Sequence, residues 1–271
     1  MELRNVRLNM DEVPRHWLGG RRSVTLFLDN LSTFFPLGER FFVQAANAHR
    51  PFVKDPRLEV ALRLFAGQEG AHSREHARYN QRLRELGYPV EQMEARVDRL
   101  LRLVARVLPP RAQLAATCAL EHLTALMAHM LLDHPRALDG AHPTMAALWR
   151  WHAAEEGEHK AVAFDVYRAA GGPYWERAGL MVIASLVFWA KVGEHQVRMM
   201  HTDGIAGSPR EWLALVRYWL FEPAHMARLA PRYLAYFRPR FHPSDLDDQA
   251  MVDTWKQAYA AEAVYHRREV A

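Results

Sequence analysis

The sequence predicts an all-α protein built as a four-helix bundle with additional C-terminal helices. Hydrophobic residues recur three or four positions apart along nearly the whole chain of 271 residues, which is the period of an amphipathic helix. No run of alternating Val, Ile and Thr lies between tight-turn dipeptides, as a β-sheet would require. Prolines and glycines divide the chain into segments of helical length.

Four segments form the expected bundle, and a fifth connects them. Proline marks their boundaries, because it is tolerated in the first turn of a helix and disrupts the interior. The bundle segments cover residues 36–49, 56–86, 110–134 and 143–170, and residues 89–108 bridge the second and the third. Since this bridge is itself amphipathic, we expect two helix pairs joined by a long crossover.

We expect one domain, residues 1–271, with a bundle core at 22–172 and a C-terminal helical elaboration at 173–271. The longest uncharged run, residues 178–190, would form a helix of about 20 Å, short of the roughly 30 Å hydrocarbon layer. We therefore predict a buried helix there. The alternative is an interfacial membrane contact through the aromatic residues around it, Tyr174, Trp175 and Trp189. The stretch 248–268 is polar enough to lie on the surface.

Composition argues against several classes of protein. The 35 basic and 31 acidic residues give a net charge of +4 and are scattered along the chain, which does not favour nucleic-acid binding. The first residues lack the apolar core of a signal peptide, so we expect a cytoplasmic protein, with membrane association as the alternative. The single cysteine, Cys118, cannot form an intrachain disulfide.

Glutamate and histidine interrupt the apolar stripe of two predicted helices. In the second bundle helix, Glu69 and His72 lie on the face that otherwise turns toward the core. In the fourth, Glu156 and His159 repeat the same Glu-x-x-His pattern. Because buried charge is costly unless it is paired or coordinated, the two motifs together indicate a metal site.

Each motif follows a lone inward glutamate. Glu39 lies among phenylalanines of the first helix, and Glu121 lies among small apolar residues of the third. One Glu from each of two helices, with Glu-x-x-His from each of the other two, is the ligand arrangement of ferritin-like di-iron and di-manganese proteins. Carboxylates bridge two hard metal ions, and imidazole gives each ion a terminal ligand. We therefore predict a ferritin-like bundle that holds a dinuclear metal centre.

A third histidine ligand has two candidates. His152 lies one turn before Glu156, and His76 lies one turn after His72. We favour His152 as a ligand and His76 as a hydrogen-bonding neighbour, with the reverse roles left open. The predicted ligands are then Glu39, Glu69, His72, Glu121, His152, Glu156 and His159. No catalytic residue is predicted apart from the metal centre itself.

Other polar residues near the motifs are given outer roles. Glu155 and Glu158 lack the three-residue spacing to His159, so we assign them to solvent or to the support of the ligands. Candidates to orient the ligand histidines from outside are Asp165, Tyr79 and Asn80.

Three stretches, 68–72, 121–125 and 155–165, carry a family resemblance. Through them nearly the whole chain resembles a bacterial family labelled predicted metal-dependent hydrolase. That label implies hydrolysis, whereas the ligand pattern is more similar to that of oxygen-activating di-iron proteins. The face formed by His152, Glu156 and His159 also resembles the three-histidine di-iron site of ferritin-like arylamine N-oxygenases. This second resemblance implies that all three residues are ligands, and it does not extend to an arylamine substrate.

The predicted function is oxidation of a small, hydrophobic organic substrate by dioxygen at two reduced irons. The first alternative is hydrolysis by a water molecule activated between two metal ions, which would suit zinc or manganese. A further alternative is iron handling or peroxide scavenging. Ligands that are mostly glutamates on rigid helices favour oxidation, because this environment is typical of oxygen chemistry.

The expected cofactors are two metal ions, with iron favoured over manganese or zinc. The expected partners are a small-molecule substrate, dioxygen and an electron-donor protein. A homodimer and a peripheral membrane contact are further expectations.

Overall fold

The computed structural model describes residues 1–221 and 226–269. Within these residues the protein is helical and contains no strand, apart from an isolated bridge between Leu18 and Ala141. The all-α class is therefore confirmed. The helices are α1 (Arg22–Ser32), α2 (Phe35–Ala48), α3 (Pro56–Glu85), α4 (Val90–Val107), α5 (Pro110–Asp133), α6 (Pro143–His159), α7 (Val162–Ala169), α8 (Tyr174–Thr202), α9 (Pro209–Leu220), α10 (Ala230–Ala235) and α11 (Gln249–Glu269). Short 3-10 turns cover Arg50–Phe52, Pro135–Leu138, Met226–Leu229 and Pro243–Asp245.

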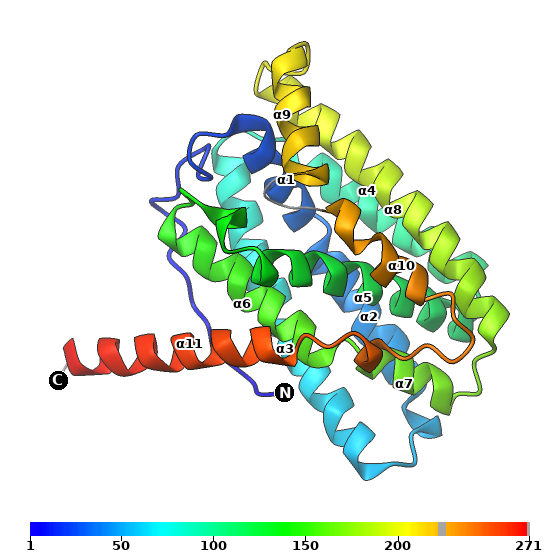
Figure 1. Ribbon diagram of the computed structural model, residues 1–271. Coiled ribbons are helices and arrows are strands. Elements are labelled where there is room, and N and C mark those ends of the chain that lie inside the picture. Colours follow the sequence, from blue (N-terminus) through cyan, green and yellow to red (C-terminus); the bar gives the residue numbers. More distant parts are fainter. Residues whose placement is uncertain (222–225, 270–271) are drawn as a thin grey trace.

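Two helix pairs form the centre of the molecule (Figure 1). Helix α2 packs against α3, and α5 packs against α6, while α4 connects the two pairs. This is the pairing that the long bridge at residues 89–108 predicted. The more specific description as a ferritin-like bundle stays a prediction, as does the division of the chain at residue 172.

Local chemistry explains where the bundle helices begin. Proline occupies the first turn of α2, α3, α5 and α6, where its missing N–H and fixed φ are harmless. The Asp55 side chain caps α3 by accepting a 2.8 Å hydrogen bond from the backbone N–H of Arg57. Such a cap stabilises a helix by about 1 kcal/mol.

The predicted helix at residues 143–170 is wrong in one respect. It is divided into α6 and α7 by a turn at Lys160 and Ala161, directly after His159. The Lys160 ammonium binds Asp248 and the carbonyl of Leu246 at this turn. A tertiary contact from the C-terminal segment therefore accompanies a break that the local sequence does not announce.

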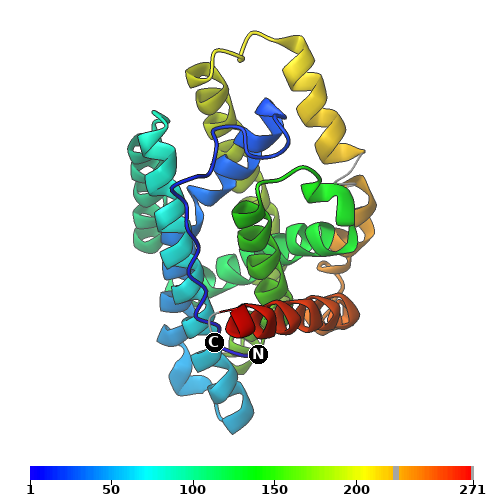
Figure 2. The same ribbon diagram turned by 90° about the vertical axis from the view of Figure 1, so that its left-hand side faces the viewer.

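Segments near both ends of the chain contact the bundle (Figure 2). The N-terminal segment runs along α3, where Leu3 sits so close to Gly67 that a Cβ there would lie 2.5 Å from its Cδ2. Helix α11 crosses α6 at Gly157, where a Cβ would lie 2.8 Å from Cγ2 of Val252. Glycine at these two positions permits the close approach of the neighbouring segment.

Helix α8 departs from the prediction of a buried helix. Two helices of the described chain, α5 and α8, are long and apolar enough to cross a membrane by length and composition. Of the apolar window of α5, 83% is buried, against 22% of that of α8. Helix α8 packs on α5 and α1 with one side, while Val182, Ile183 and Leu186 on its other side are exposed. The prediction of a buried helix at residues 178–190 is therefore wrong.

Candidate metal centre

The seven predicted ligand residues converge between the two helix pairs. Helix α2 contributes Glu39, α3 contributes Glu69 and His72, α5 contributes Glu121, and α6 contributes His152, Glu156 and His159. None of the seven is more than 3% exposed. Aromatic rings enclose the histidines: Phe35 lies 4.5 Å from the His152 ring, Trp151 4.8 Å from the His72 ring and Phe65 5.1 Å from the His159 ring, centroid to centroid. The site is therefore dry and lies within the hydrophobic core.

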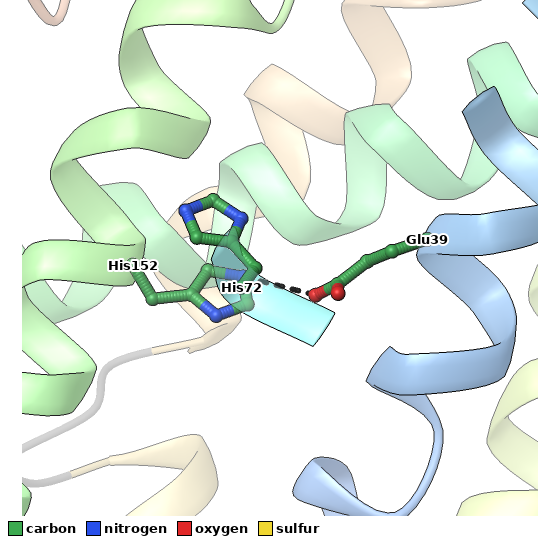
Figure 3. A group of neighbouring side chains, drawn as sticks. All are labelled: Glu39, His72 and His152. Atoms are coloured by element: carbon green, nitrogen blue, oxygen red, sulfur yellow. Dashed lines mark ion pairs between the residues drawn. The ribbon is translucent and has the colours of Figure 1, made fainter. Parts of the chain in front are cut away.

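Six of the residues form two clusters with metal-binding geometry. The first consists of Glu39, His72 and His152 (Figure 3), and the second of Glu69, Glu156 and His159. In each cluster, one nitrogen or carboxylate oxygen from every residue lies within 4.8 Å of the others. Distances of this size leave room for one metal ion per cluster.

The clusters adjoin each other and Glu121. Nδ1 of His72 lies 3.7 Å from Oε2 of Glu69 and 3.9 Å from Oε1 of Glu156. Glu121 belongs to neither cluster, but its Oε2 lies 3.8 Å from Nε2 of His159. The structure thus brings all seven predicted residues together at one buried location.

Many polar atoms of these residues lack a hydrogen-bond partner among the described residues. They are Oε1 of Glu39, both carboxylate oxygens of Glu69 and Glu121, Oε2 of Glu156, both ring nitrogens of His72 and Nε2 of His159. Of these atoms, Nε2 of His72 lies at ion-pair distance from Glu155. Leaving such groups buried and unsatisfied is costly, so native proteins pair or coordinate them. Four carboxylates and three imidazoles, facing one another in this way, match the donors that iron, manganese and zinc take. The residues present therefore fit a dinuclear metal centre.

The electrostatics of the carboxylates support the same conclusion. Burial raises the pKa of Glu39 and of Glu121 well above the usual range, and the nearby charge of Glu69 raises both further. Burial also acts upward on Glu156, but the charge of His159 and the hydrogen bond with His152 bring its pKa well below the usual range. Carboxylates packed this closely ionise together only beside positive charge, which bound metal ions would supply in addition to the nearby histidines.

Each of the three histidines is held from outside through one ring nitrogen. Nδ1 of His159 donates to Oε1 of Gln68 at 3.1 Å, which leaves its Nε2 facing Glu69 at 3.3 Å. Nδ1 of His152 is 2.7 Å from Nε2 of His76, which leaves its Nε2 facing Glu156 at 3.0 Å. Ligand histidines usually show this arrangement, because an outer partner fixes the ring and its tautomer.

The third histidine, His72, is held by Glu155. Its Nε2 lies 3.1 Å from Oε2 of Glu155, so Nδ1 is the nitrogen directed at the clusters. Glu155 is fully buried, and its other oxygen accepts a 2.9 Å hydrogen bond from Arg4. The sequence assigned Glu155 either to solvent or to the support of a ligand. This geometry agrees with support of His72 and not with exposure to solvent.

The other residues predicted to support the histidines have different contacts in the structure. His76 has both ring nitrogens engaged, by His152 and by Ser32 Oγ at 2.9 Å, so it lies behind His152. Asp165 instead pairs with His242 at 2.9 Å, and Tyr79 binds Asp29. Asn80 reaches His76 only through Ser32. The prediction that Asp165, Tyr79 and Asn80 orient the candidate ligand histidines by direct contact is therefore wrong.

Gln68 and Arg4 are the supporting residues that the sequence reasoning missed. Gln68 directly precedes Glu69 and is fully buried, and a buried amide on an apolar stripe could have indicated a role. Its amide donates to Oε2 of Glu158 at 2.7 Å. Arg4 carries no comparable signal, because its partners on α6 are more than 150 residues away in sequence.

An apolar cavity of about 170 Å³ reaches the site from one side. It lies between α2, α4, α5 and α8, and its polar lining residues are Glu39, Thr124 and Lys191. A second cavity of about 30 Å³ is lined by His152 and Glu156 and shares Thr124 with the first. The larger cavity has the size of one that holds benzene, and the smaller has room for about one water-sized molecule.

The fold and the two clusters define an all-α protein whose buried side chains are placed to bind metal ions. The chain belongs to the family described as predicted metal-dependent hydrolase, whose model matches residues 2–247. This match covers the bundle and most of the C-terminal helices, and it confirms the family resemblance of the sequence motifs. No curated protein and no solved structure matches the chain at a significant level.

Proposed function

We propose that this protein is a dinuclear metalloenzyme that oxidises a small apolar substrate. Glu39, His72 and His152 would hold one ion, and Glu69, Glu156 and His159 the other, with Glu121 beside the second. The observation that carries the proposal is the set of buried, unpartnered carboxylate and imidazole atoms that face one another between the clusters. Iron is the metal proposed, because glutamate oxygens predominate and imidazoles complete the set; manganese and zinc are the alternatives.

The reaction class is inferred from the surroundings of the site. If iron is bound, two reduced ions would supply electrons to dioxygen, and this chemistry requires that water be kept away from the reacting groups. The described lining of the large cavity is hydrophobic apart from Glu39, Thr124 and Lys191, so it excludes water and accepts an apolar molecule. Dioxygen, a small-molecule substrate and an electron-donor protein are the partners proposed for this reaction.

The protein's own residues have separate roles in this proposal. Gln68, His76 and Glu155 keep the three imidazoles oriented through their outer nitrogens. The Ser73 hydroxyl donates to Oε2 of Glu39 at 2.8 Å, which fixes the carboxylate at the end of the substrate cavity. Rigid support of this kind keeps donor atoms in the geometry that a reaction needs.

Hydrolysis is the second candidate, and the family's description favours it over oxidation. Two metal ions would lower the pKa of a bound water and polarise the bond to be cleaved. The small cavity beside His152 and Glu156 has room for such a water. Iron handling or peroxide scavenging is a third candidate, with no separate observation in its favour.

Metal analysis and oxygen uptake test the proposal together. Protein from cells grown with added iron should contain two iron ions per chain, and after ferrous loading without air it should consume oxygen. Glu69→Gln should lose both properties. Glu85→Gln is the matched control, because Glu85 lies on the same helix with a side chain 51% exposed, and it should retain both.

Each outcome selects one reaction class. Stoichiometric zinc or manganese, with no oxygen uptake after iron loading, would refute oxidation and favour hydrolysis, to be assayed on esters and phosphoesters. Oxygen uptake that stops once the added ferrous ion is consumed, with no organic substrate oxidised in the presence of a reductant, would favour iron handling.

A further inference from the structure

Helix α8 carries an apolar face that no described element covers. Its outward side presents Trp175, Val182, Ile183, Leu186 and Val197, which are between 45% and 80% exposed. These residues are separated by about one, two and three helical turns, which places them on one side of the helix. Between Arg177 and Lys191 the helix carries no charged residue. A contiguous apolar surface of this length marks an interaction site.

One edge of this face borders the large cavity. Ile183 and Val187 of α8 line the cavity, and both are exposed to solvent. Leu101 and Val104 of α4 line it on the opposite side. Buried Glu39 lies at the inner end. The apolar face is thus continuous with an apolar path to the first cluster.

Cationic side chains are exposed on α4, the helix that lines the cavity together with α8. Arg99, Arg102 and Arg106 are exposed on that helix, together with the apolar residues Leu103 and Val107, which are 55% and 65% exposed. Arg102 pairs with Asp98. In the described part of the chain, Arg99 and Arg106 have no carboxylate partner. Apolar residues bordered by free arginines are typical of surfaces that bind anionic membranes.

A second copy of the chain fits this surface less well than a lipid bilayer does. In a two-fold dimer the same patch would meet itself, so the unpaired arginines of the two copies would approach each other without acidic partners. The second copy would also close the mouth of the cavity. A bilayer offers anionic headgroups to the arginines and leaves the mouth open to lipophilic molecules.

Helix α8 would lie along the membrane rather than cross it. Its inner side packs on α5 and α1 and buries polar residues, including His195 and Gln196. Pulling it into the hydrocarbon layer would expose these groups and uncover the core. Docking by the outer face preserves both contacts.

We propose that the exposed face of α8 with the adjoining flank of α4 docks on an anionic lipid bilayer, and that an apolar chain enters the cavity from this bilayer. The cavity has room for a group about the size of benzene, or for the end of an acyl chain. Oxidation of that chain at the metal centre rests on the proposed function above. Docking and cavity binding do not, because neither requires turnover.

Vesicle sedimentation tests the docking surface. The wild-type protein should sediment with vesicles of equal parts phosphatidylcholine and phosphatidylglycerol, and only weakly with phosphatidylcholine alone. Val182→Glu should reduce binding by about tenfold, since it removes an apolar contact and adds repulsion. Val60→Glu on α3 is a matched control, because both valines are 45% exposed, and it should bind as the wild type does.

The arginines provide a second, independent readout. Arg99→Glu with Arg106→Glu should abolish the preference for anionic vesicles, whereas Arg63→Glu, at an exposed position of α3, should not. Equal binding by Val182→Glu and Val60→Glu would overturn the proposal. The proposal would also be overturned if the wild-type protein is a dimer in sedimentation equilibrium, Val182→Glu dissociates this dimer, and neither protein binds vesicles. A second copy of the chain would then cover the face.

A fluorescent fatty acid, cis-parinaric acid, tests the cavity without metal or turnover. Ile183→Trp narrows the mouth and should weaken its binding by about tenfold. Leu186→Trp is the control, because Leu186 is exposed on the same helix but does not line this cavity. Equal affinities in the two variants would overturn the cavity assignment. A wild-type protein that binds parinaric acid and vesicles as expected but consumes no oxygen after ferrous loading would instead refute the proposed function. It would leave the docking surface and the cavity assignment standing.

Discussion

Replacing Arg4 by methionine should destabilise the protein and weaken metal binding. The Arg4 guanidinium lies 2.9 Å from Glu155 and 2.8 Å from Glu158, and the three side chains are 4%, 0% and 2% exposed. Methionine keeps the aliphatic part of the side chain but leaves two buried carboxylates without this cation. Removing one partner of a buried ion pair costs about 3–5 kcal/mol in the free energy of unfolding.

The effect on metal binding follows from the position of Glu155. This carboxylate lies between Arg4 and Nε2 of His72, so it orients a predicted ligand. Loss of an outer partner of this kind typically lowers metal affinity by about 10–100-fold. We therefore expect Arg4→Met to change both quantities, although Arg4 touches none of the predicted ligands.

Urea denaturation and competition with a chromophoric chelator measure the two effects separately. Arg7→Met is the control, because Arg7 lies in the same N-terminal segment and is exposed; it should resemble the wild type in both assays. If Arg4→Met is destabilised but binds metal as tightly as Arg7→Met, the reasoning that connects the N-terminal segment to His72 is refuted.

Three further predictions concern the residues around α6. Glu158→Gln should lower the stability by about 3 kcal/mol at neutral pH, since burial is outweighed by hydrogen bonds from Arg4, Lys256 and Gln68, which hold the pKa of Glu158 at about 2. This stabilisation is fully present above a pH of about 4.5 and is lost as the pH falls through about 2, so urea titrations of variant and wild type should converge there. Gln68→Leu should weaken metal binding by about tenfold or more in calorimetric titrations, because Nδ1 of His159 loses its acceptor. Gly157→Val should lower the stability to heat, since its side chain would overlap that of Val252 on α11, and overpacking costs about 1–3 kcal/mol.

Each of these predictions has an outcome that contradicts it. If the free energies of unfolding of Glu158→Gln and wild type differ by the same amount at neutral and at acidic pH, the ionised carboxylate of Glu158 does not stabilise the fold. Metal affinity unchanged in Gln68→Leu would mean that His159 needs no outer partner. For Gly157→Val the control is Gly70→Val, a helical position of α3 where a Cβ meets nothing within 4 Å; equal stability of the two would disprove the close packing of α11.

The inward direction of the candidate ligand residues could be predicted because it depends on local periodicity. Glu69 with His72, and Glu156 with His159, lie three residues apart on helices whose remaining inward residues are apolar, so their direction follows from helix geometry alone. Glu39 and Glu121 were predicted from their order in the chain. The structure brings all of them together between the two helix pairs.

Tertiary contacts explain what could not be predicted. Helices α5 and α8 have similar hydropathies, 1.3 and 1.2, yet differ in burial because neighbours surround one and not the other. The break after His159 coincides with contacts of Lys160 to residues near 248. The hydrophobic periodicity within a segment does not show which distant segments will cover a helix or contact Lys160.

The two sides of the candidate metal centre differ in their surroundings. Behind His72 and His159, the support is polar and comes from both ends of the chain, since Arg4 and Lys256 both bind Glu158. On the side of Glu39, the surroundings are an apolar cavity that opens at α8. Charge that stabilises the ligands is therefore kept away from the path that an apolar molecule would take. It follows that Glu39 is the predicted ligand nearest to the substrate, so a bound substrate should perturb the first cluster more than the second.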